Sequence, residues 1–432
     1  MLTETVNEYN DNYFSFNYPA YWSSDYKGMG EAAVNLDLAW EIKQISNGNY
    51  ALNNFENQNI DKYLLPGDEI WITQNRVNGY VEPVIGDRPR PFKAWVYEVS
   101  SNGMIKLLDE EGIRVDQYKV TNGSFKIIRS GYRNMQEASM ATVTSMVNPL
   151  YKNGQLVQNI SNDVNNPLYQ TSFTNDKWKE YRIINSSAIE YSNFWAGQCE
   201  CNLPSIEVDE NGNLVLNIEP INYNDLDFDV VGFMEQAYNP YVYNILGNWR
   251  AKKSYAYLTG RYHSEHVTPR ISGFYEDFYP YYKLDGSKKW VKNTTYLNKW
   301  TFASEVTQYN PYGQEVENRD ALNRYSSALY GYNYRFPLAV ASNTKYRELG
   351  YDGFEDYDFS TCDSLSHFGF EGSLDANNIK VSNSYSHTGR KSLRVAPSSD
   401  ENGRSALLSK KIISCGANAT TTKQGKAKRT IK

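Results

Sequence analysis

The sequence predicts a mostly β protein made of several antiparallel sheet units, and three observations predict it. Aromatic residues are abundant, with 37 Tyr, 17 Phe and 9 Trp among 432 residues, and such side chains favour strands. Asn-Gly and Asp-Gly dipeptides, which suit the tight turns of antiparallel hairpins, recur along the chain. Frequent Asn residues indicate a polar surface that is rich in loops.

Each of these dipeptides is expected to form the tip of a hairpin. The flanks support this expectation, because residues 94–99 and 104–108, on either side of one tip, are rich in apolar and β-branched residues. The expected tips are Asn47-Gly48, Asn78-Gly79, Asn102-Gly103, Asn122-Gly123, Asn153-Gly154, Asn211-Gly212 and Asp285-Gly286.

One short helix is predicted over residues 338–349, which read LAVASNTKYREL. The segment follows Pro337 and stops at Gly350, as helices often do. Residues 320–333 fit both a helical stripe and a strand rich in tyrosine, so both interpretations stay open there.

Charge and hydropathy exclude some classes of partner. The net charge of −6 gives no basic field across the chain, so no nucleic-acid partner is expected. No run of about 18 apolar residues is present, so no membrane span is expected. Residues 1–16 lack the basic start and apolar run of a signal peptide, which taken alone favours the cytoplasm.

Motifs for catalysis are missing from the sequence. There is no nucleophile elbow, phosphate-binding loop or dinucleotide fingerprint, so no catalytic residue is assigned and a non-enzymatic role is favoured. His263 and His266 are three residues apart, and Cys199 and Cys201 are closer than a CxxC pair. Either pair could contribute to a metal site, but a polar loop and a strand with two thiols are the expected alternatives.

Two acidic groups are candidates for a site. Asp225, Asp227 and Asp229 alternate along the chain, so in a strand they share one face and could bind calcium, the one cofactor that the sequence suggests. A solvent-exposed acidic face is the alternative interpretation. Glu276 and Asp277 are candidates for one half of a glycosidase carboxylate pair, with a distant partner.

Several segments resemble known repeat proteins. Residues 309–313, YNPYG, resemble the Tyr-Asp-x-x-Gly core of the YD repeats of Rhs-type proteins, with Asn310 in place of the aspartate. In that family such units are strand-turn-strand pieces of large shells. Further segments resemble very large, mostly uncharacterised Bacteroidetes surface or secreted proteins, which implies a secreted or cell-surface location and no catalytic residue. These segments are residues 125–134, 184–192, 247–257, 325–333 and 346–356.

The C-terminal part resembles a second kind of module. Residues 353–356, GFED, and residues 386–395, SHTGRKSLRV, are similar to the first strands of a galactose-binding-like jelly roll, as found in carbohydrate-binding modules. The resemblance implies that His387 is a turn residue. The chain that remains after Tyr351 is too short for about eight strands, so a partial module is expected.

These observations predict five regions. They are an N-terminal β segment at 1–66, a small β barrel or sandwich at 67–131, a Tyr-rich, Rhs-like β region at 132–350, a partial jelly roll at 351–415 and a disordered basic tail at 416–432.

The sequence thus predicts a non-catalytic structural or scaffold portion of a large secreted or cell-surface protein. Its partners would be a glycan or other parts of the same large protein. Tyr309, Tyr312, Tyr330 and Tyr332 are expected to pack on sheet faces or to stack against glycans. The alternatives are a carbohydrate-binding surface module, a glycoside hydrolase and the shell of an Rhs-type polymorphic toxin.

Overall fold

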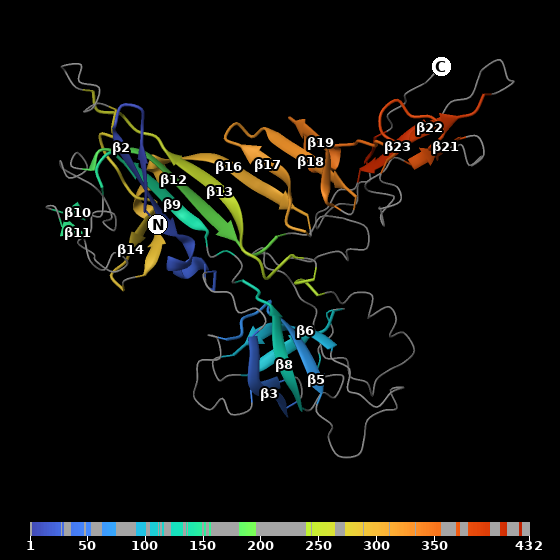
Figure 1. Cartoon of the computed structure of the whole chain (residues 1–432), viewed down its shortest axis with the longest axis horizontal. Coiled ribbons are helices and arrows are strands. Elements are labelled where there is room, and N and C mark those ends of the chain that lie inside the picture. Colours follow the sequence, from blue (N-terminus) through green and yellow to red (C-terminus); the bar gives the residue numbers. More distant parts are fainter. Residues whose placement is uncertain are drawn as a thin grey trace. The chain divides into compact units, whose positions relative to one another are not determined.

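The computed structural model confirms a mostly β chain with several antiparallel sheets (Figure 1). It describes residues 2–26, 28–29, 36–46, 49–52, 63–74, 92–100, 104–110, 112, 115, 122–132, 135, 137–148, 151–152, 155–156, 181–195, 239–242, 244–263, 273–287, 289–310, 312–332, 334–355, 369–371, 379–397, 407–412 and 423–425. Contact clustering divides the chain into two compact units, residues 1–194 with 218–305, and residues 195–217 with 306–432.

The helical elements that lie wholly within the described residues are short 3-10 turns, and the other named elements are strands. The turns are η1 (Ala20–Trp22), η2 (Ser24–Tyr26), η8 (Thr294–Lys299) and η9 (Tyr346–Glu348). The strands are β1 (Leu2–Val6), β2 (Asn12–Pro19), β3 (Leu36–Ser46), β4 (Asn49–Leu52), β5 (Glu69–Gln74), β6 (Phe92–Val99), β7 (Ile105–Leu108), β8 (Asn122–Arg129), β9 (Ser139–Ser145), β10 (Tyr151–Lys152), β11 (Gln155–Leu156), β12 (Ile183–Ser192), β13 (Arg250–Tyr257), β14 (Tyr282–Leu284), β15 (Trp290–Lys292), β16 (Trp300–Tyr309), β17 (Glu315–Asp320), β18 (Tyr325–Gly331), β19 (Phe336–Ser342), β20 (Gly369–Glu371), β21 (Ile379–Ser382), β22 (Ser392–Val395), β23 (Leu407–Ile412) and β24 (Lys423–Gly425).

The largest sheet has the strand order β1-β2-β9-β12-β13-β16-β17-β18-β19. Alternation of side chains explains why its strands form: along β2 the residues Phe14, Phe16 and Tyr18 are buried while their neighbours are less so. The strands from β1 to β13 belong to the first unit, and β17 to β19 belong to the second.

Aromatic rings form much of the core of the first unit. The Tyr257 ring lies 5.2 Å from the rings of both Phe278 and Trp300, in edge-to-face contacts, and all three side chains are buried. Such pairs contribute about 0.5 to 1.5 kcal/mol each beyond the burial of their area. The abundance of tyrosine is therefore, at least in this unit, a property of the core.

Six strands in the first unit pair in a closed ring, in the order β3-β4-β7-β6-β5-β8. Its interior is aliphatic and includes Ile70, Ile72, Val96 and Ile127. The contact that joins β4 to β7 is a single residue pair, Tyr50↔Ile105. The predicted boundary between 66 and 67 falls inside this ring, because β3 and β4 precede it in the sequence and pair with later strands.

The predicted hairpins have mixed outcomes. Strands pair on both sides of Asn47-Gly48, Asn102-Gly103, Asn153-Gly154 and Asp285-Gly286, which confirms the four hairpins, although the first three dipeptides themselves lie outside the described residues. Asn78-Gly79 and Asn211-Gly212 lie outside the described residues.

The hairpin prediction for Asn122-Gly123 is wrong, because both residues belong to β8. Gly123 pairs with Ile42 of β3 and with Gln74 of β5. The ladders on both sides of the strand thus outweigh the local turn preference of this dipeptide.

The helix prediction for residues 338–349 is also wrong over its first half. Residues up to Ser342 belong to β19 and pair with β18, so tertiary pairing overrides the weak local helix signal. A single 3-10 turn, η9, lies in the second half. Of the two interpretations left open for residues 320–333, the strand is the one observed, as β18.

The C-terminal region contains a three-stranded sheet, β20-β23-β24, and the β21-β22 hairpin. The Glu355 carboxylate accepts hydrogen bonds from the backbone N–H groups of Arg390 and Lys391, 2.7 Å each. His387 lies in the exposed turn that this carboxylate holds. Strand β24 lies within the segment expected to be a disordered tail.

A five-residue turn recurs between strands of the large sheet. In the β16-β17 turn, Oδ1 of Asn310 accepts hydrogen bonds from the N–H groups of Tyr312 and Gln314, and Gly313 has φ +87°. In the β17-β18 turn, Oδ1 of Asp320 accepts from residues two and four positions later in the same way. This geometry matches a three-residue hairpin loop that ends in a left-handed residue.

Each turn needs one side-chain acceptor oxygen, which Asn310 supplies in one and Asp320 in the other. We expect Asn310→Asp to change the free energy of unfolding by about 1 kcal/mol or less. We expect Asn310→Ala to lower it by about 1 to 3 kcal/mol, because two backbone N–H groups lose their acceptor. Urea unfolding of both variants measures these changes in the free energy of unfolding. Asp320→Ala, in the β17-β18 turn, is the matched variant. Equal losses for Asn310→Asp and Asn310→Ala would contradict the interpretation.

Candidate functional site

The structure does not test the candidate calcium ligands. Asp225, Asp227 and Asp229 lie outside the described residues, as do His266 and the cysteines. His263 is described and is exposed. Within the described ranges, no group of three or more His, Cys, Asp or Glu side chains is arranged to hold a metal ion.

The four predicted tyrosines have different surroundings. Tyr309 is buried and its ring lies 4.5 Å from Trp195, edge to face. Tyr330 is half-buried in β18. Tyr312 is 66% exposed, and its ring stacks 5.1 Å from that of Tyr334.

Tyr332 follows β18 in a left-handed backbone conformation, with φ +54°, and its ring meets Phe336 edge to face at 6.0 Å. A bulky residue rarely adopts this conformation, which costs about 1 to 3 kcal/mol. The structure thus places Tyr309 in a packing role and leaves Tyr312 open to solvent.

Glu276 and Asp277, the candidates for one half of a glycosidase pair, both contact other groups of the chain. Oδ1 of Asp277 accepts hydrogen bonds from the hydroxyls of Tyr257, at 3.0 Å, and Thr259, at 2.8 Å. Its Oδ2 forms an ion pair with Lys299 at 3.5 Å. A carboxylate oxygen of Glu276 lies against the backbone of Gly260. Asp277 therefore fixes the position of neighbouring side chains.

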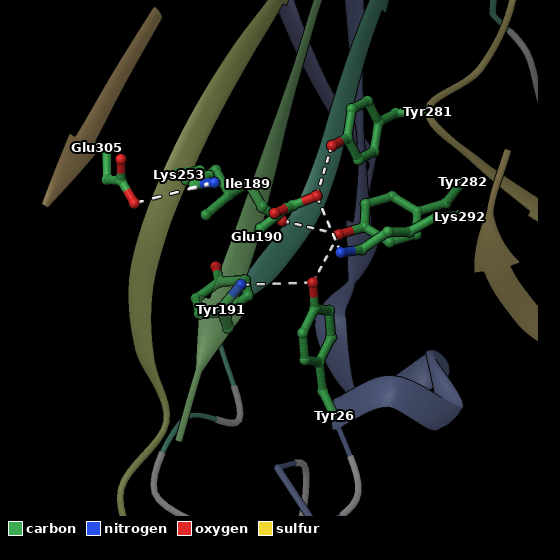
Figure 2. Close-up of polar contacts among 9 residues, drawn as sticks. All are labelled: Tyr26, Ile189, Glu190, Tyr191, Lys253, Tyr281, Tyr282, Lys292 and Glu305. Atoms are coloured by element: carbon green, nitrogen blue, oxygen red, sulfur yellow. Dashed lines mark hydrogen bonds and ion pairs between the residues drawn. The ribbon is translucent and has the colours of Figure 1, made fainter. Parts of the chain in front are cut away.

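A different carboxylate, Glu190 of β12, is the centre of a buried polar cluster (Figure 2). Its Oε1 accepts a hydrogen bond of 2.6 Å from the Tyr281 hydroxyl and lies 2.9 Å from Nζ of Lys292. Tyr26 and Tyr282 lie beside it. We call Tyr26, Glu190, Tyr281, Tyr282 and Lys292 the Glu190 cluster.

The cluster lies where the pairing of β12 with its neighbour β9 stops. The pairing of these two strands ends at Ala188↔Ala141. Ile189 and Tyr191 are two residues apart, so their backbone groups point to the same side of the strand. The C=O of Ile189 accepts from the Tyr282 hydroxyl at 3.0 Å, and the N–H of Tyr191 donates to the Tyr26 hydroxyl at 3.4 Å. The hydroxyls of Tyr282 and Tyr26 are thus the hydrogen-bond partners of β12 backbone groups that do not pair with β9.

The directions of these hydrogen bonds follow from chemistry. Tyr282 donates its only hydroxyl proton to the Ile189 carbonyl, so in its 2.7 Å contact with Tyr26 it must accept. Tyr26 is therefore the donor there, and its oxygen is free to accept from the N–H of Tyr191. Each hydroxyl both donates and accepts, so the chain of hydrogen bonds is complete between an amide and a carbonyl.

A third tyrosine hydroxyl, that of Tyr191, also bonds to the backbone near the end of the β9-β12 pairing. The Tyr191 hydroxyl donates to the carbonyl of Ser139, the first residue of β9, at 2.8 Å. The Tyr191 and Tyr26 rings also meet edge to face at 5.4 Å. The beginning of β9 and the part of β12 that follows this pairing are thus joined by tyrosine side chains.

Electrostatics keeps Glu190 ionised although its side chain is only 17% exposed. Burial alone would raise the pKa of this carboxyl, but hydrogen bonds from Tyr281 and Lys292 and the positive charges of Lys292 and Lys253 hold the pKa below its usual value. Lys253 also pairs with Glu305 at 3.9 Å, on the adjacent strand β16.

The net pKa shift of the phenols is in the opposite direction, because burial is the dominant cause there. Burial raises the pKa of Tyr26 to about 12. Burial and the nearby Glu190 carboxylate raise the pKa of Tyr281, and burial also raises that of Tyr282. All three hydroxyls therefore stay protonated at neutral pH and act as hydrogen-bond donors.

A small cavity of about 10 Å³ lies among Tyr281, Tyr282, Phe278 and Trp300. This volume is about the minimum that a single water molecule needs. The cavity is a packing space within the aromatic core, and it is too small for a sugar ring or another organic substrate.

Sequence reasoning missed the Glu190 cluster. Glu190 lies in residues 184–192, which the sequence distinguishes only by their resemblance to large Bacteroidetes surface or secreted proteins. No motif connects Glu190 to Tyr281, which is 91 residues away. One signal was present: residues 278–282, FYPYY, are dense in tyrosine next to a proline. A polar strand residue and a remote aromatic run cannot be paired without the sheet register.

Comparison of the chain with protein-family models, curated proteins and solved structures returned no match. In the part of the chain that the structure describes, no helix has the length and apolar character needed to cross a membrane.

Glu190 should contribute stability that depends on pH. Because its folded pKa is lowered, the contribution is fully present above the unfolded pKa of about 4.3 and is lost as pH falls through the folded value. We expect Glu190→Gln to lower the free energy of unfolding at pH 7 by about 1 to 3 kcal/mol. The difference from wild type should shrink below about pH 4, where the wild-type carboxylate takes up its proton.

Urea unfolding over a series of pH values measures this difference. The matched control is Glu98→Gln, since Glu98 also pairs with a lysine, at 2.6 Å, but its side chain is 44% exposed. That change should alter the free energy of unfolding by about 0.5 kcal/mol or less. A Glu190→Gln effect that stays constant from neutral to acidic pH would show that ionisation of Glu190 is irrelevant to folding.

Proposed function

We propose that the chain is a non-catalytic, structural part of a large secreted or cell-surface protein, and that the Glu190 cluster stabilises its main sheet. This proposal rests on the hydrogen-bond and ion-pair partners of the polar groups in the Glu190 cluster. The Glu190 carboxylate and the hydroxyls of Tyr26 and Tyr282 all bind other groups of the chain. A carboxylate held in this way links β12 to the β14-β15 hairpin, as expected of a structural element.

Two further observations support a structural role. Both carboxylate oxygens of Asp277, which catalysis would require, contact Tyr257, Thr259 and Lys299. These contacts argue against the hydrolase alternative. The resemblance of residues 309–313 to YD units supports membership of a larger assembly, and the resemblance of the other segments to Bacteroidetes surface or secreted proteins supports a secreted or surface location. The toxin-shell alternative shares this structural role and differs in what the assembly would enclose.

A double-mutant cycle tests the structural role. We expect Glu190→Gln and Lys292→Met each to destabilise the fold, and we expect their coupling energy to be about 0.5 to 3 kcal/mol, because the two groups contact each other in a partly buried place. Urea unfolding of the wild type, both single variants and the double variant gives this energy. Wild-type stability in Glu190→Gln, together with loss of hydrolysis of a polysaccharide by that variant, would overturn the proposal in favour of an enzyme.

A second candidate function, glycan binding, rests on Tyr312. Its exposed ring is backed by Tyr334 at an interplanar angle of 29°, which presents a flat aromatic surface to solvent. Such a surface suits the apolar face of a pyranose ring.

Affinity electrophoresis in gels that contain soluble polysaccharides tests this second function. The wild type should be retarded by at least one polysaccharide, and Tyr312→Ala should lose most of the retardation. The control is Tyr385→Ala, which removes a ring that is 85% exposed at another place in the chain. Retardation that both variants keep, or no retardation of the wild type, would count against this function.

A further inference from the structure

Strand β19 is the last strand of the large sheet, and it has an open edge. Its residues pair with β18 from Gly331↔Phe336 to Ser326↔Ser342. Among the described residues no strand pairs with its other side. Unpaired backbone N–H and C=O groups at a sheet edge are ready partners for another strand.

The composition of β19 does not protect this edge. Residues 336–344 read FPLAVASNT and contain no charged residue. Val340 is 76% exposed and Phe336 is 61% exposed. Edge strands in monomeric proteins are commonly protected by lysines, prolines or bulges. In β19 the protection consists of Pro337 and of a bulge at Leu338, the residue skipped where the pairing with β18 shifts from Ala339 to Pro337, so residues 339–342 remain unprotected.

The opposite edge of the sheet differs. Strand β1 reads LTETV and has the charged Glu4 at its centre, where the Asn12 side chain donates to it at 2.8 Å. A central charge disfavours pairing of this strand with an identical strand. The two edges of the sheet therefore have different capacities for association.

The open part of β19 is complementary to itself. In an antiparallel pair centred on Val340, this residue faces its own copy and Ala339 faces Ala341. Opposite residues in such a pair lie on the same face of the sheet, so the two valines would form an apolar contact on one face and the small alanines would meet on the other. Within residues 338–342 no like charges face each other, and the charged residues Arg335 and Lys345 lie outside this segment.

We propose that residues 338–342 form an interface with the same residues of a second copy of this chain, as an antiparallel strand pair with twofold symmetry. The backbone ladder supplies the hydrogen bonds, and the contact between the valines supplies apolar burial. Because a five-residue strand pair is a small interface, the association is reversible and depends on concentration. This inference does not depend on the structural role of the Glu190 cluster.

Sedimentation velocity of the full chain at increasing concentration tests the interface. We expect the dimer fraction to rise with concentration, and we expect Val340→Lys to raise the dissociation constant at least about tenfold, because two lysines would face each other across the pair. Val6→Lys is the matched control, since Val6 is 56% exposed at the end of β1. It should leave the dimer unchanged.

Hydrogen exchange adds a readout for the residues involved. Amides of residues 338–342 should exchange more slowly at high concentration than at low concentration, while those of β1 should not change. A monomer at every concentration would overturn the proposal, as would a dimer that is insensitive to Val340→Lys. Open-ended polymers that Val6→Lys also blocks would show that β19 pairs with β1 of another copy, and would overturn the twofold interface.

Discussion

The main sheet of the first unit depends on hydrogen bonds that tyrosine hydroxyls make to the backbone of β12. Beyond Ala188 this strand extends past its pairing with β9, and unpaired backbone groups in a buried place would cost about 1 to 3 kcal/mol each. Tyr282 and Tyr26 satisfy the C=O of Ile189 and the N–H of Tyr191. The two hydroxyls take the place of ladder hydrogen bonds from β9, and the aromatic core packs around both rings.

Glu190 adds an electrostatic constraint to this arrangement. The carboxylate is stabilised by a phenol and an ammonium group, from Tyr281 and Lys292, and in return it fixes the β14-β15 hairpin, which begins beside Tyr281 and ends at Lys292. A buried ion pair is not by itself strong evidence of stability, because removal of two charges from water is costly. The value of this pair is positional: it sets Tyr282 against Ile189. This interpretation gives the many tyrosines a structural role that fits a scaffold.

The structural features that depend on residues close together in the sequence could be predicted. The fold class follows from composition, and four hairpins follow from dipeptides that suit tight turns. Predictions failed where distant strands decide the outcome: Gly123 is held between β3 and β5, and Val340 pairs with β18. The Glu190 cluster was out of reach for the same reason, since the hydroxyls of Tyr26 and Tyr282 meet across 256 residues.

Hydrogen exchange at the amide of Tyr191 tests the central claim most directly. If the Tyr26 hydroxyl is the acceptor for this N–H, then Tyr26→Phe should speed exchange at Tyr191 while exchange at Ser187, within the paired part of β12, stays as in the wild type. Unchanged exchange at Tyr191 in the Tyr26→Phe variant would show that the phenol does not complete the hydrogen bonding of this strand, and would contradict the account.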